Sequence, residues 1–413
     1  MAARIIAGLC LSALVTLEAV VTAQWPQFRG PTGQGHSDAR GLPLEWDESR
    51  NVVWKTPVPG RGWSSPVVAD GRVWLTTAVK EQGGSLRLLA FDVGTGRELV
   101  NAEVFHTRSG DPINAKNSLA SPTPVVEGDR VYVHFGADGT AAVTTSGEIV
   151  WTQRLRYESQ HGNGGSPILY EDLLIFSGDG SDTAFVVALD KGTGEIRWRT
   201  RRRAPADQAY STPLLIRVGD RDQLVSVGAY RAAAYDPASG REIWRVGYRD
   251  GFSNVPRPVY GHGLVYVATG FQQPTLLAVR ADGTGDVTQS HIAWTMTRAA
   301  PLTPSPILVG EELYTVSDIG IANCVDAKTG DILWQQRLGG NYSASPVFAD
   351  GRIYFLSEEG VTTVVEPGRA FRQLATSALD GFTLASMAVS EESFFIRSHT
   401  HLYRIASPPE TRR

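Results

Sequence analysis

Residues 188–198 read ALDKGTGEIRW, and the same pattern returns as AYDPASGREIW at 234–244 and as CVDAKTGDILW at 324–334. In each copy an apolar run leads to an Asp, and a Trp follows that Asp after eight residues. The Asp side chain can hydrogen-bond the backbone amides of a turn, and the Gly after it accepts the positive φ that a tight turn needs. The pattern therefore predicts a β-hairpin whose second strand ends in Trp.

A second repeated signal precedes each hairpin. It is a Ser/Thr-Pro step, or a close relative of it, followed by a short apolar strand, a turn and another strand rich in aromatic and β-branched residues. The marking prolines are spaced 40 to 58 residues apart, at positions 66, 124, 167, 213, 258, 306 and 346. Each period then contains four strands, and four-stranded repeats of about 40–50 residues are typical of the blades of a β-propeller.

The two ends of the repeated region complement one another. An eighth unit begins near Ser386 and runs out after its third strand, whereas NVVWK at 51–55 offers a single strand with Trp54 in the matching place. Pairing these segments in one blade would close the ring and remove an open sheet edge. We therefore expect an all-β, eight-bladed propeller of four-stranded antiparallel blades over residues 51–407, or seven blades if the last unit is degenerate.

The segments outside the repeats have separate interpretations. Residues 1–23 contain Arg4, an apolar run and small residues before position 24, which predicts a cleaved export signal and a periplasmic or extracellular protein. A membrane anchor is the alternative, but the apolar run is shorter than the roughly 20 residues that a span requires. Residues 24–50 form a lead segment, and residues 408–413 are expected to be a disordered tail.

Composition excludes several classes of function. The chain of 413 residues has 39 Lys and Arg against 43 Asp and Glu, for a net charge of −4, which argues against a nucleic-acid partner. No stretch after the signal is long and apolar enough to span a membrane, and we expect a monomer. Removing residues 1–23 leaves Cys324 as the only Cys, so neither an intrachain disulfide nor a cysteine-based zinc site can form.

The hairpins at 188–198 and 324–334 follow the pattern A-x-D-x-x-T-G-x-x-x-W, with Cys324 in the Ala place. They resemble the pyrrolo-quinoline quinone (PQQ) repeat family of β-propellers, and the resemblance covers most of residues 51–405. The family contains quinoprotein dehydrogenases and also non-enzymatic scaffolds, such as the periplasmic lipoprotein that assists outer-membrane β-barrel assembly. The opening QWPQFRGPTGQG at 24–35 is similar to exported bacterial propellers known only by their repeats. The resemblance thus implies the fold and leaves the function open.

Polar residues crowd the loops that enter each innermost strand, and in a propeller these loops gather around the axis at one face. Convergent amides, aromatic rings and cations there would suit a polar or anionic ligand. The alternative is that the small polar side chains only satisfy turn backbones. The residues predicted to bind a ligand on this axial face are Arg61, Trp63, Lys116, Asn117, His161, Asn163, Tyr210, Asn254, Arg257, Asn341 and Tyr342.

Two functions remain open from the sequence. The first is an exported, non-catalytic scaffold that binds a protein, a glycan or a small polar ligand on the axial face. The alternative is a PQQ-dependent dehydrogenase that oxidises alcohols or sugars. The resemblance implies that such enzymes pair a catalytic Asp with calcium, and the larger ones add a disulfide of adjacent cysteines, which this chain cannot form. We predict no catalytic residue, no metal site and no certain cofactor, with PQQ and calcium as the alternative.

Two charged stretches contain residues that could form a site. SGDGSD at 177–182 offers oxygen ligands for calcium but lacks the spacing of a twelve-residue calcium loop, so a hairpin tip is the favoured interpretation. The basic run after Trp198 is predicted to be a solvated connection between blades; it comprises Arg199, Arg201, Arg202 and Arg203.

Overall fold

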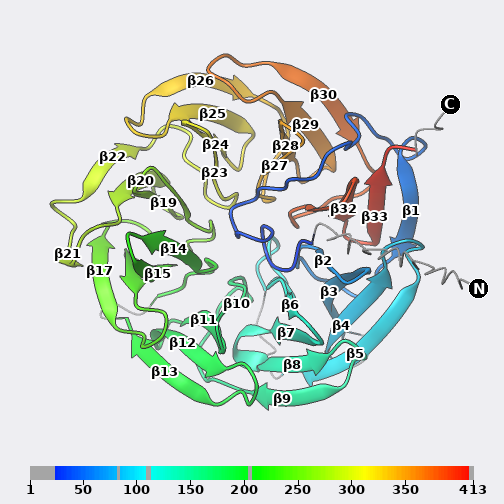
Figure 1. Cartoon of the computed structure of the whole chain (residues 1–413), viewed down its shortest axis with the longest axis horizontal. Coiled ribbons are helices and arrows are strands. Elements are labelled where there is room, and N and C mark those ends of the chain that lie inside the picture. The colour runs from blue at the N-terminus through cyan, green and yellow to red at the C-terminus, as the bar shows by residue number, and fades with distance from the viewer. Residues whose placement is uncertain (1–23, 81–83, 108–112, 203–206, 409–413) are drawn as a thin grey trace, which may run out of the picture.

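The computed structural model describes residues 24–80, 84–107, 113–202 and 207–408. Its strands form eight sheets arranged around a central axis (Figure 1). The expected all-β propeller with eight four-stranded antiparallel blades is thereby confirmed. The predicted signal (residues 1–23) and most of the predicted tail (409–413) lie outside the described residues. No helix among the described residues is long and apolar enough to cross a membrane.

The first four blades follow one another along the chain, each from its innermost to its outermost strand. Blade one contains β2 (Val67–Ala69), β3 (Arg72–Val79), β4 (Ser85–Asp92) and β5 (Glu98–His106). Blade two contains β6 (Val125–Glu127), β7 (Arg130–His134), β8 (Thr140–Thr144) and β9 (Ile149–Gln153), with the 3-10 turn η2 (Gly136–Asp138) between β7 and β8. Blade three contains β10 (Ile168–Tyr170), β11 (Leu173–Asp179), β12 (Ala184–Asp190) and β13 (Ile196–Arg201). Blade four contains β14 (Leu214–Val218), β15 (Arg221–Gly228), β16 (Arg231–Tyr235) and β17 (Glu242–Gly247).

The other four blades complete the circle. Blade five contains β18 (Val259–Gly261), β19 (Leu264–Thr269), β20 (Thr275–Arg280) and β22 (Ile292–Met296), while the short β21 (Gly285–Asp286) joins the outer edge of blade four. Blade six contains β23 (Ile307–Val309), β24 (Glu312–Val316), β25 (Ile321–Asp326) and β26 (Ile332–Arg337). Blade seven contains β27 (Val347–Ala349), β28 (Arg352–Leu356), β29 (Val361–Val365) and β30 (Gln373–Ala378). Blade eight contains β31 (Ala388–Ser390), β32 (Ser393–Arg397), β33 (His401–Ala406) and the early strand β1 (Val52–Pro57).

Blade eight combines both ends of the repeated region, as the sequence predicted. Strand β1 pairs antiparallel with β33, with Lys55 opposite Tyr403, and the two ends lie side by side in Figure 1. The indole of Trp54 then reaches blade one, where its Nε1 donates a hydrogen bond to the carbonyl of Val93 at 2.9 Å. The chain ends therefore close the ring, because the start of the repeated region supplies the fourth, outermost strand of the last blade.

The repeated Trp and Gly explain how blades attach to one another. Trp198 of blade three donates its Nε1–H to the carbonyl of Pro237 in the outer hairpin of blade four at 3.0 Å. Its ring lies against Gly240 of that hairpin, where an added Cβ would come within 2.4 Å of the indole. Gly240 also has φ +71°. The position therefore requires both a positive φ and the absence of a Cβ, and Gly satisfies both. Trp54, Trp151 and Trp294 contact Gly96, Gly194 and Gly330 in the same way.

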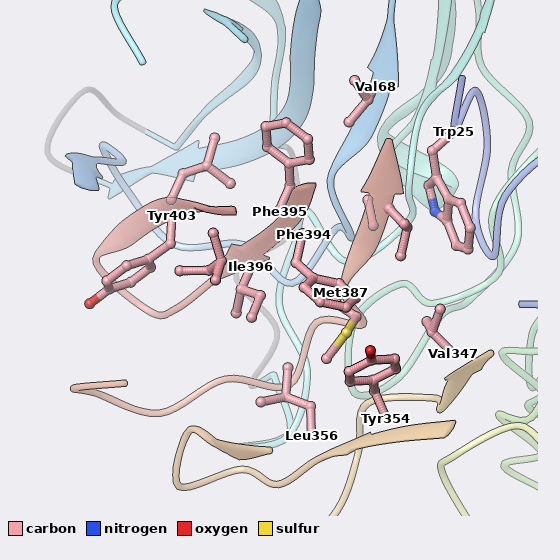
Figure 2. Packing of buried hydrophobic residues seen from close by; sticks show 14 of the residues in the cluster. Trp25, Val68, Val347, Tyr354, Leu356, Met387, Phe394, Phe395, Ile396 and Tyr403 are labelled. Atoms are coloured by element: carbon pink, nitrogen blue, oxygen red, sulfur yellow. The ribbon is translucent and has the colours of Figure 1, made fainter. Parts of the chain in front are cut away.

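The core is a series of apolar layers between adjacent blades. Figure 2 shows one layer, to which β31, β32 and β33 contribute together with blades one and seven and the lead segment. Tyr354 of blade seven packs on Phe394 of blade eight with ring centroids 4.7 Å apart, and Trp46 of the lead segment packs on the same Phe394 at 5.3 Å. The lead segment (residues 24–50) is therefore part of the folded core.

Candidate functional site

A ring of hydrogen bonds surrounds the axis at the start of the innermost strands. The residue before each marking Pro is usually Ser or Thr, and its hydroxyl accepts the backbone N–H of the matching residue in the preceding blade. We call Ser65, Thr123, Ser166, Thr212, Ser305, Ser345 and Ser386 the hydroxyl ring. The bonds are Ser65 N to Thr123 Oγ1 (3.0 Å), Thr123 N to Ser166 Oγ (2.9 Å), Ser166 N to Thr212 Oγ1 (2.9 Å), Arg257 N to Ser305 Oγ (2.9 Å), Ser305 N to Ser345 Oγ (3.0 Å), Ser345 N to Ser386 Oγ (2.9 Å) and Ser386 N to Ser65 Oγ (3.1 Å).

Blade five departs from the ring. Its matching residue is Arg257, which has no hydroxyl to accept the N–H of Thr212. The Arg257 side chain is 2% exposed, and its Nη1 donates to the carbonyl of Phe28 in the lead segment at 2.7 Å. Arg257 therefore turns away from the axial face, toward the lead segment.

The lead segment crosses the centre of the ring of blades, as the dark-blue trace in Figure 1 shows. It pairs with the far ends of inner strands: Trp25 with Val68 of β2, and Gly35 with Phe348 of β27, both through backbone hydrogen bonds of 2.8–2.9 Å. Between them, Gln34 Oε1 accepts the N–H of Tyr260 on β18 at 2.7 Å. Blades one, five and seven are thus bridged by a single strap.

At the axial face the channel opens into a cavity of about 100 Å³, which we call the funnel. The hydroxyl ring lines it together with Trp63, Lys116, Asn117 and Tyr210, and Phe28 of the lead segment reaches it from the other end. The Lys116 Nζ forms an ion pair of 2.8 Å with Glu358 on the turn between β28 and β29. Because these two residues belong to blades two and seven, their ion pair links loops of different blades at the mouth of the funnel.

The structure divides the predicted ligand-binding residues into three sets. Trp63, Lys116, Asn117 and Tyr210 line the funnel. Arg61, His161 and Asn341 are exposed on nearby loops and do not line the funnel. The remaining side chains are buried: Asn163, Asn254, Arg257 and Tyr342.

Two of the buried residues, Asn254 and Asn163, use their side chains to satisfy turn backbones, which is the alternative role stated in the sequence analysis. Asn254 Nδ2 donates to the carbonyls of Gly228 at 2.7 Å and Gly251 at 3.3 Å, and its Oδ1 accepts the N–H of Gly270. Asn163 Nδ2 donates to the carbonyl of Phe135 at 2.9 Å. Both amides hold backbone turns together between blades.

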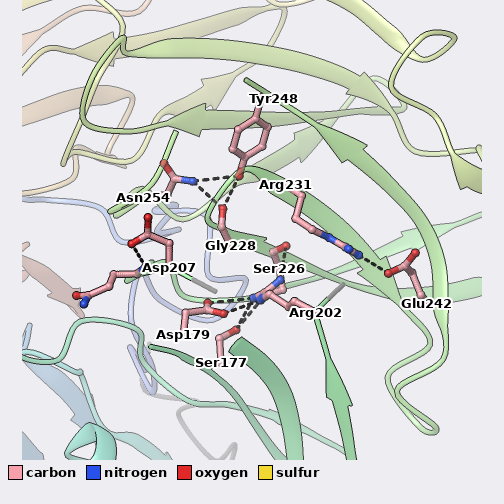
Figure 3. A network of polar contacts seen from close by, with 11 residues as sticks. Ser177, Asp179, Arg202, Asp207, Ser226, Gly228, Arg231, Glu242, Tyr248 and Asn254 are labelled. Atoms are coloured by element: carbon pink, nitrogen blue, oxygen red, sulfur yellow. Dashed lines mark hydrogen bonds and ion pairs between the residues drawn. The ribbon is translucent and has the colours of Figure 1, made fainter. Parts of the chain in front are cut away.

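Asp179 of the acidic stretch and Arg202 of the basic run form a buried ion pair, whereas Arg199 and Arg201 are exposed and Arg203 lies outside the described residues. Asp179 and Arg202 are joined by bonds of 2.7 and 3.2 Å, and Ser177 and Ser226 complete the partners of the guanidinium (Figure 3). The prediction of a solvated connection is therefore wrong for Arg202. Asp182, the other carboxylate, accepts the N–H of Glu158.

The residues around the funnel do not fit PQQ with calcium. The cavity of about 100 Å³ is well below the roughly 300–1,000 Å³ of typical small-molecule sites. Among the described residues, no three His, Cys, Asp or Glu side chains come together as a metal site would require. Cys324 is buried in β25, where desolvation raises the pKa of its thiol to about 12.

Apolar side chains stand on the axial face around the funnel. Phe271 on the β19–β20 turn is 66% exposed, Ile319 on the β24–β25 turn is 57% exposed, and Phe382 on the loop entering β31 is 42% exposed. Phe382 also stacks between Trp63 and His399, with ring centroids 5.1 and 4.8 Å away. Exposed aromatic residues in such an arrangement are typical of surfaces that contact other proteins.

The fold and the repeated Trp–Gly joints define the chain as a PQQ-like β-propeller. A model of the family described as outer membrane protein assembly factor BamB matches residues 37–163 and 284–393, more than half of the chain, and the protein belongs to that family. The comparison with curated proteins found no match.

Solved structures share the fold at low sequence identity. BamB from Moraxella catarrhalis aligns with a TM-score of 0.60 and 14% identity, over 86% of this chain and 99% of that one. A europium-containing methanol dehydrogenase aligns with a TM-score of 0.62 and 10% identity, over 93% and 90%. The computationally designed Ika8 protein aligns with a TM-score of 0.61 and 9% identity, over 86% and 100%. At these identities the likeness extends to the fold, which hosts scaffolds and enzymes alike.

Proposed function

We propose that this protein is an exported, non-catalytic scaffold that binds a protein partner through its axial face. The observation that carries the proposal is the set of exposed apolar side chains on loops of this face, at Phe271, Ile319 and Phe382. Membership of the BamB family supports a scaffold or binding role. Export rests on the predicted signal at residues 1–23.

The chemistry of the axial face favours a macromolecular partner over a small substrate. The funnel holds only about 100 Å³, and the ammonium group of Lys116 is already paired with Glu358. Aromatic anchors such as Phe271 and Phe382, by contrast, supply most of the binding energy at protein interfaces when a partner excludes water from them. No observation on this face favours a dehydrogenase or a glycan-binding site over a protein-binding one.

Site-specific photo-crosslinking tests the proposal. A photoreactive phenylalanine analogue replaces Phe271 or Phe382 on the axial face, and replaces Leu44 of the lead segment as a control that is also exposed. In cells that make the protein, we expect the two axial positions to crosslink to the same protein and Leu44 not to do so. Crosslinks to that protein from Leu44 alone, or none from either axial position, would contradict the proposal.

A matched pair of variants tests whether the crosslinked protein binds through the same side chains. Phe271→Ser and Phe382→Ser each remove an exposed ring, and we expect either to weaken binding of the purified partner at least tenfold, as loss of an interface anchor does. Val53→Ser removes an apolar side chain of comparable exposure from β1 and should leave binding unchanged. Equal effects of all three would argue against a specific axial interface.

A further inference from the structure

Two guanidinium groups are buried in the channel beneath the funnel without a carboxylate. Arg29 comes from the lead segment and Arg257 from the entry to β18, and each is 2% exposed. Every ion pair found among residues 24–80, 84–107, 113–202 and 207–408 leaves both of them out. Buried arginines are ordinarily paired, as Arg202 is with Asp179, because a buried charge without a counter-charge is costly.

Backbone carbonyls accept hydrogen bonds from only some of the donor atoms of the two guanidinium groups. Arg29 Nη2 donates to the carbonyls of Gln34 at 2.9 Å and Pro306 at 2.7 Å, and Arg257 Nη1 donates to Phe28 at 2.7 Å. Arg29 Nε, Arg29 Nη1 and Arg257 Nε are buried with no hydrogen-bond partner. Three donor atoms of the two guanidinium groups are thus left without an acceptor, one of them on Arg257.

The electrostatics of the pair favour an anion. Burial, together with the nearby charge of Arg257, lowers the pKa of Arg29 to about 9. Burial alone lowers the pKa of Arg257 to about 9. Both side chains remain cationic at neutral pH, so the channel holds two like charges that an anion would neutralise.

Glycines in the lead segment leave room for these groups. A Cβ at Gly33 would lie 2.3 Å from Arg257 Nη1, and a Cβ at Gly35 would lie 2.8 Å from Arg29 Nη2. Only the absence of these side chains lets the strap and the guanidinium groups share the space.

A cavity of about 490 Å³ borders Arg257 on the side of the lead segment. Arg217 lines it too, with its guanidinium also in an exposed ion pair of 2.9 Å with Asp222, together with the polar side chains of Thr32 and Gln34 and the apolar side chains of Leu215 and Ile216. Its volume lies within the roughly 300–1,000 Å³ range of small-molecule sites, unlike that of the funnel. The cavity therefore offers cationic groups at one wall and apolar surface at another.

We propose that this cavity binds a small oxyanion, a phosphate or carboxylate group carried on an apolar body, with Arg257 as its main cationic contact and Arg217 at the entrance. The break in the hydroxyl ring supports this assignment: seven blades place Ser or Thr at this position and one places a buried cation next to a cavity. The site lies at the opposite end of the channel from the axial face, so it goes beyond the proposed protein-binding role and is independent of it.

Calorimetry and thermal unfolding of the whole chain from residue 24 test the site. The probes are inorganic phosphate, phenyl phosphate and benzoate, each compared with chloride at equal ionic strength. We expect saturable stabilisation by phosphate and several-fold tighter binding of phenyl phosphate, because its ring buries apolar surface in the cavity. Benzoate tests whether the cavity binds a carboxylate group as well as a phosphate group. Stabilisation no greater than that of chloride with all three probes would overturn the proposal.

Three variants locate the binding. Arg257→Ser restores the residue type of the other blades and should abolish the ligand-dependent shift. Arg217→Ser removes an exposed side chain whose surface ion pair with Asp222 should contribute little to stability, so it keeps the test valid if Arg257→Ser fails to fold. We expect it to weaken the binding of phenyl phosphate at least threefold. Arg249→Ser removes an equal charge from an exposed position elsewhere and should bind as the wild type does. Unchanged binding in Arg217→Ser, or an equal loss in Arg249→Ser, would overturn the proposal.

Discussion

Asp179 and Arg202 form a two-bonded ion pair inside the propeller, with both side chains 1% exposed. Burial opposes the charge on Arg202, but the carboxylate of Asp179 outweighs this effect and holds the pKa of Arg202 above its ordinary value. Arg202 also donates to Ser226 of the next blade at 2.7 Å. The pair therefore joins blades three and four through a buried polar contact, which is part of a wider polar network (Figure 3).

Replacing Asp179 with Asn should destabilise the protein by about 3–5 kcal/mol, because Arg202 would keep its buried charge and lose its partner. Chemical denaturation measures the difference. The control is Asp172→Asn, which breaks an ion pair with Arg197 in which both side chains are about half exposed, and it should cost less than about 1 kcal/mol. Similar losses in the two variants would refute the special role of the buried pair.

Gly240→Ala should be more destabilising than Gly351→Ala. Both glycines have nearly the same positive φ, +71° and +72°, so an Ala side chain is strained equally at each. At Gly240 the new Cβ would also meet Trp198 at 2.4 Å, whereas nothing lies within 4 Å of the Cβ at Gly351. The difference between the two free energies of unfolding isolates the contact between blades, and a difference of zero would show that the indole does not dock there.

The unfolding free energy should fall as the pH drops below about 6.5 because of His134. Burial lowers its pKa from 6.5 to about 3, and its ring packs on Phe176 with centroids 4.4 Å apart. Between these two pH values the unfolded chain takes up a proton that the folded chain refuses, so stability present above pH 6.5 is lost on acidification. From pH 6.5 to 5 the loss is about 2 kcal/mol.

The His134→Gln variant isolates this effect, because Gln carries no proton in this range. Its stability should change less between pH 6.5 and 5 than that of the wild type, measured by denaturation at each pH. Parallel pH profiles for the two proteins would assign the acid sensitivity to other groups.

Trp54→Ala should loosen the joint at which the ring closes. Trp54 is half-buried, and the substitution removes its hydrogen bond to Val93 and its contact with Gly96. We expect a loss of about 2–3 kcal/mol, below the value for a fully buried Trp. Hydrogen exchange should accelerate in β33 (His401–Ala406) for Trp54→Ala and not for Trp198→Ala, which affects a joint on another side of the ring. Equal exchange of β33 in both variants would contradict the closing role of β1.

The repeats made the fold predictable because each blade must bury the same faces against its neighbours. The Asp–Gly turn and the Trp that ends the outer strand recur in most copies because of this requirement. Trp54 occupies the same Trp position, and this predicted that residues 51–55 form the closing strand. The lead segment has no such period. Its path across the channel depends on individual contacts, such as Trp25 with Val68, which no repeat encodes.

The candidate site was predictable only in part, for a related reason. The structure places Trp63, Lys116, Asn117 and Tyr210 at the funnel, but position in the loops alone could not separate them from Asn163 and Asn254, whose amides hold turns. Arg29 was missed entirely, because a cation in a non-repeated segment gives no indication of burial. Arg257 could have been recognised as the one cation in a column of Ser and Thr before Pro.

A titration with PQQ and calcium tests the non-catalytic role most directly. Purified protein is mixed with both, and thermal unfolding and dye-linked oxidation of a panel of alcohols and sugars are measured, with a PQQ-dependent dehydrogenase as the positive control. Because the funnel is small and Phe28 lines it, we predict no turnover and no thermal shift that depends on calcium; a shift by PQQ alone that is lost in Arg257→Ser would report the cavity beside the lead segment. Saturable stabilisation accompanied by substrate-dependent dye reduction would contradict the scaffold role.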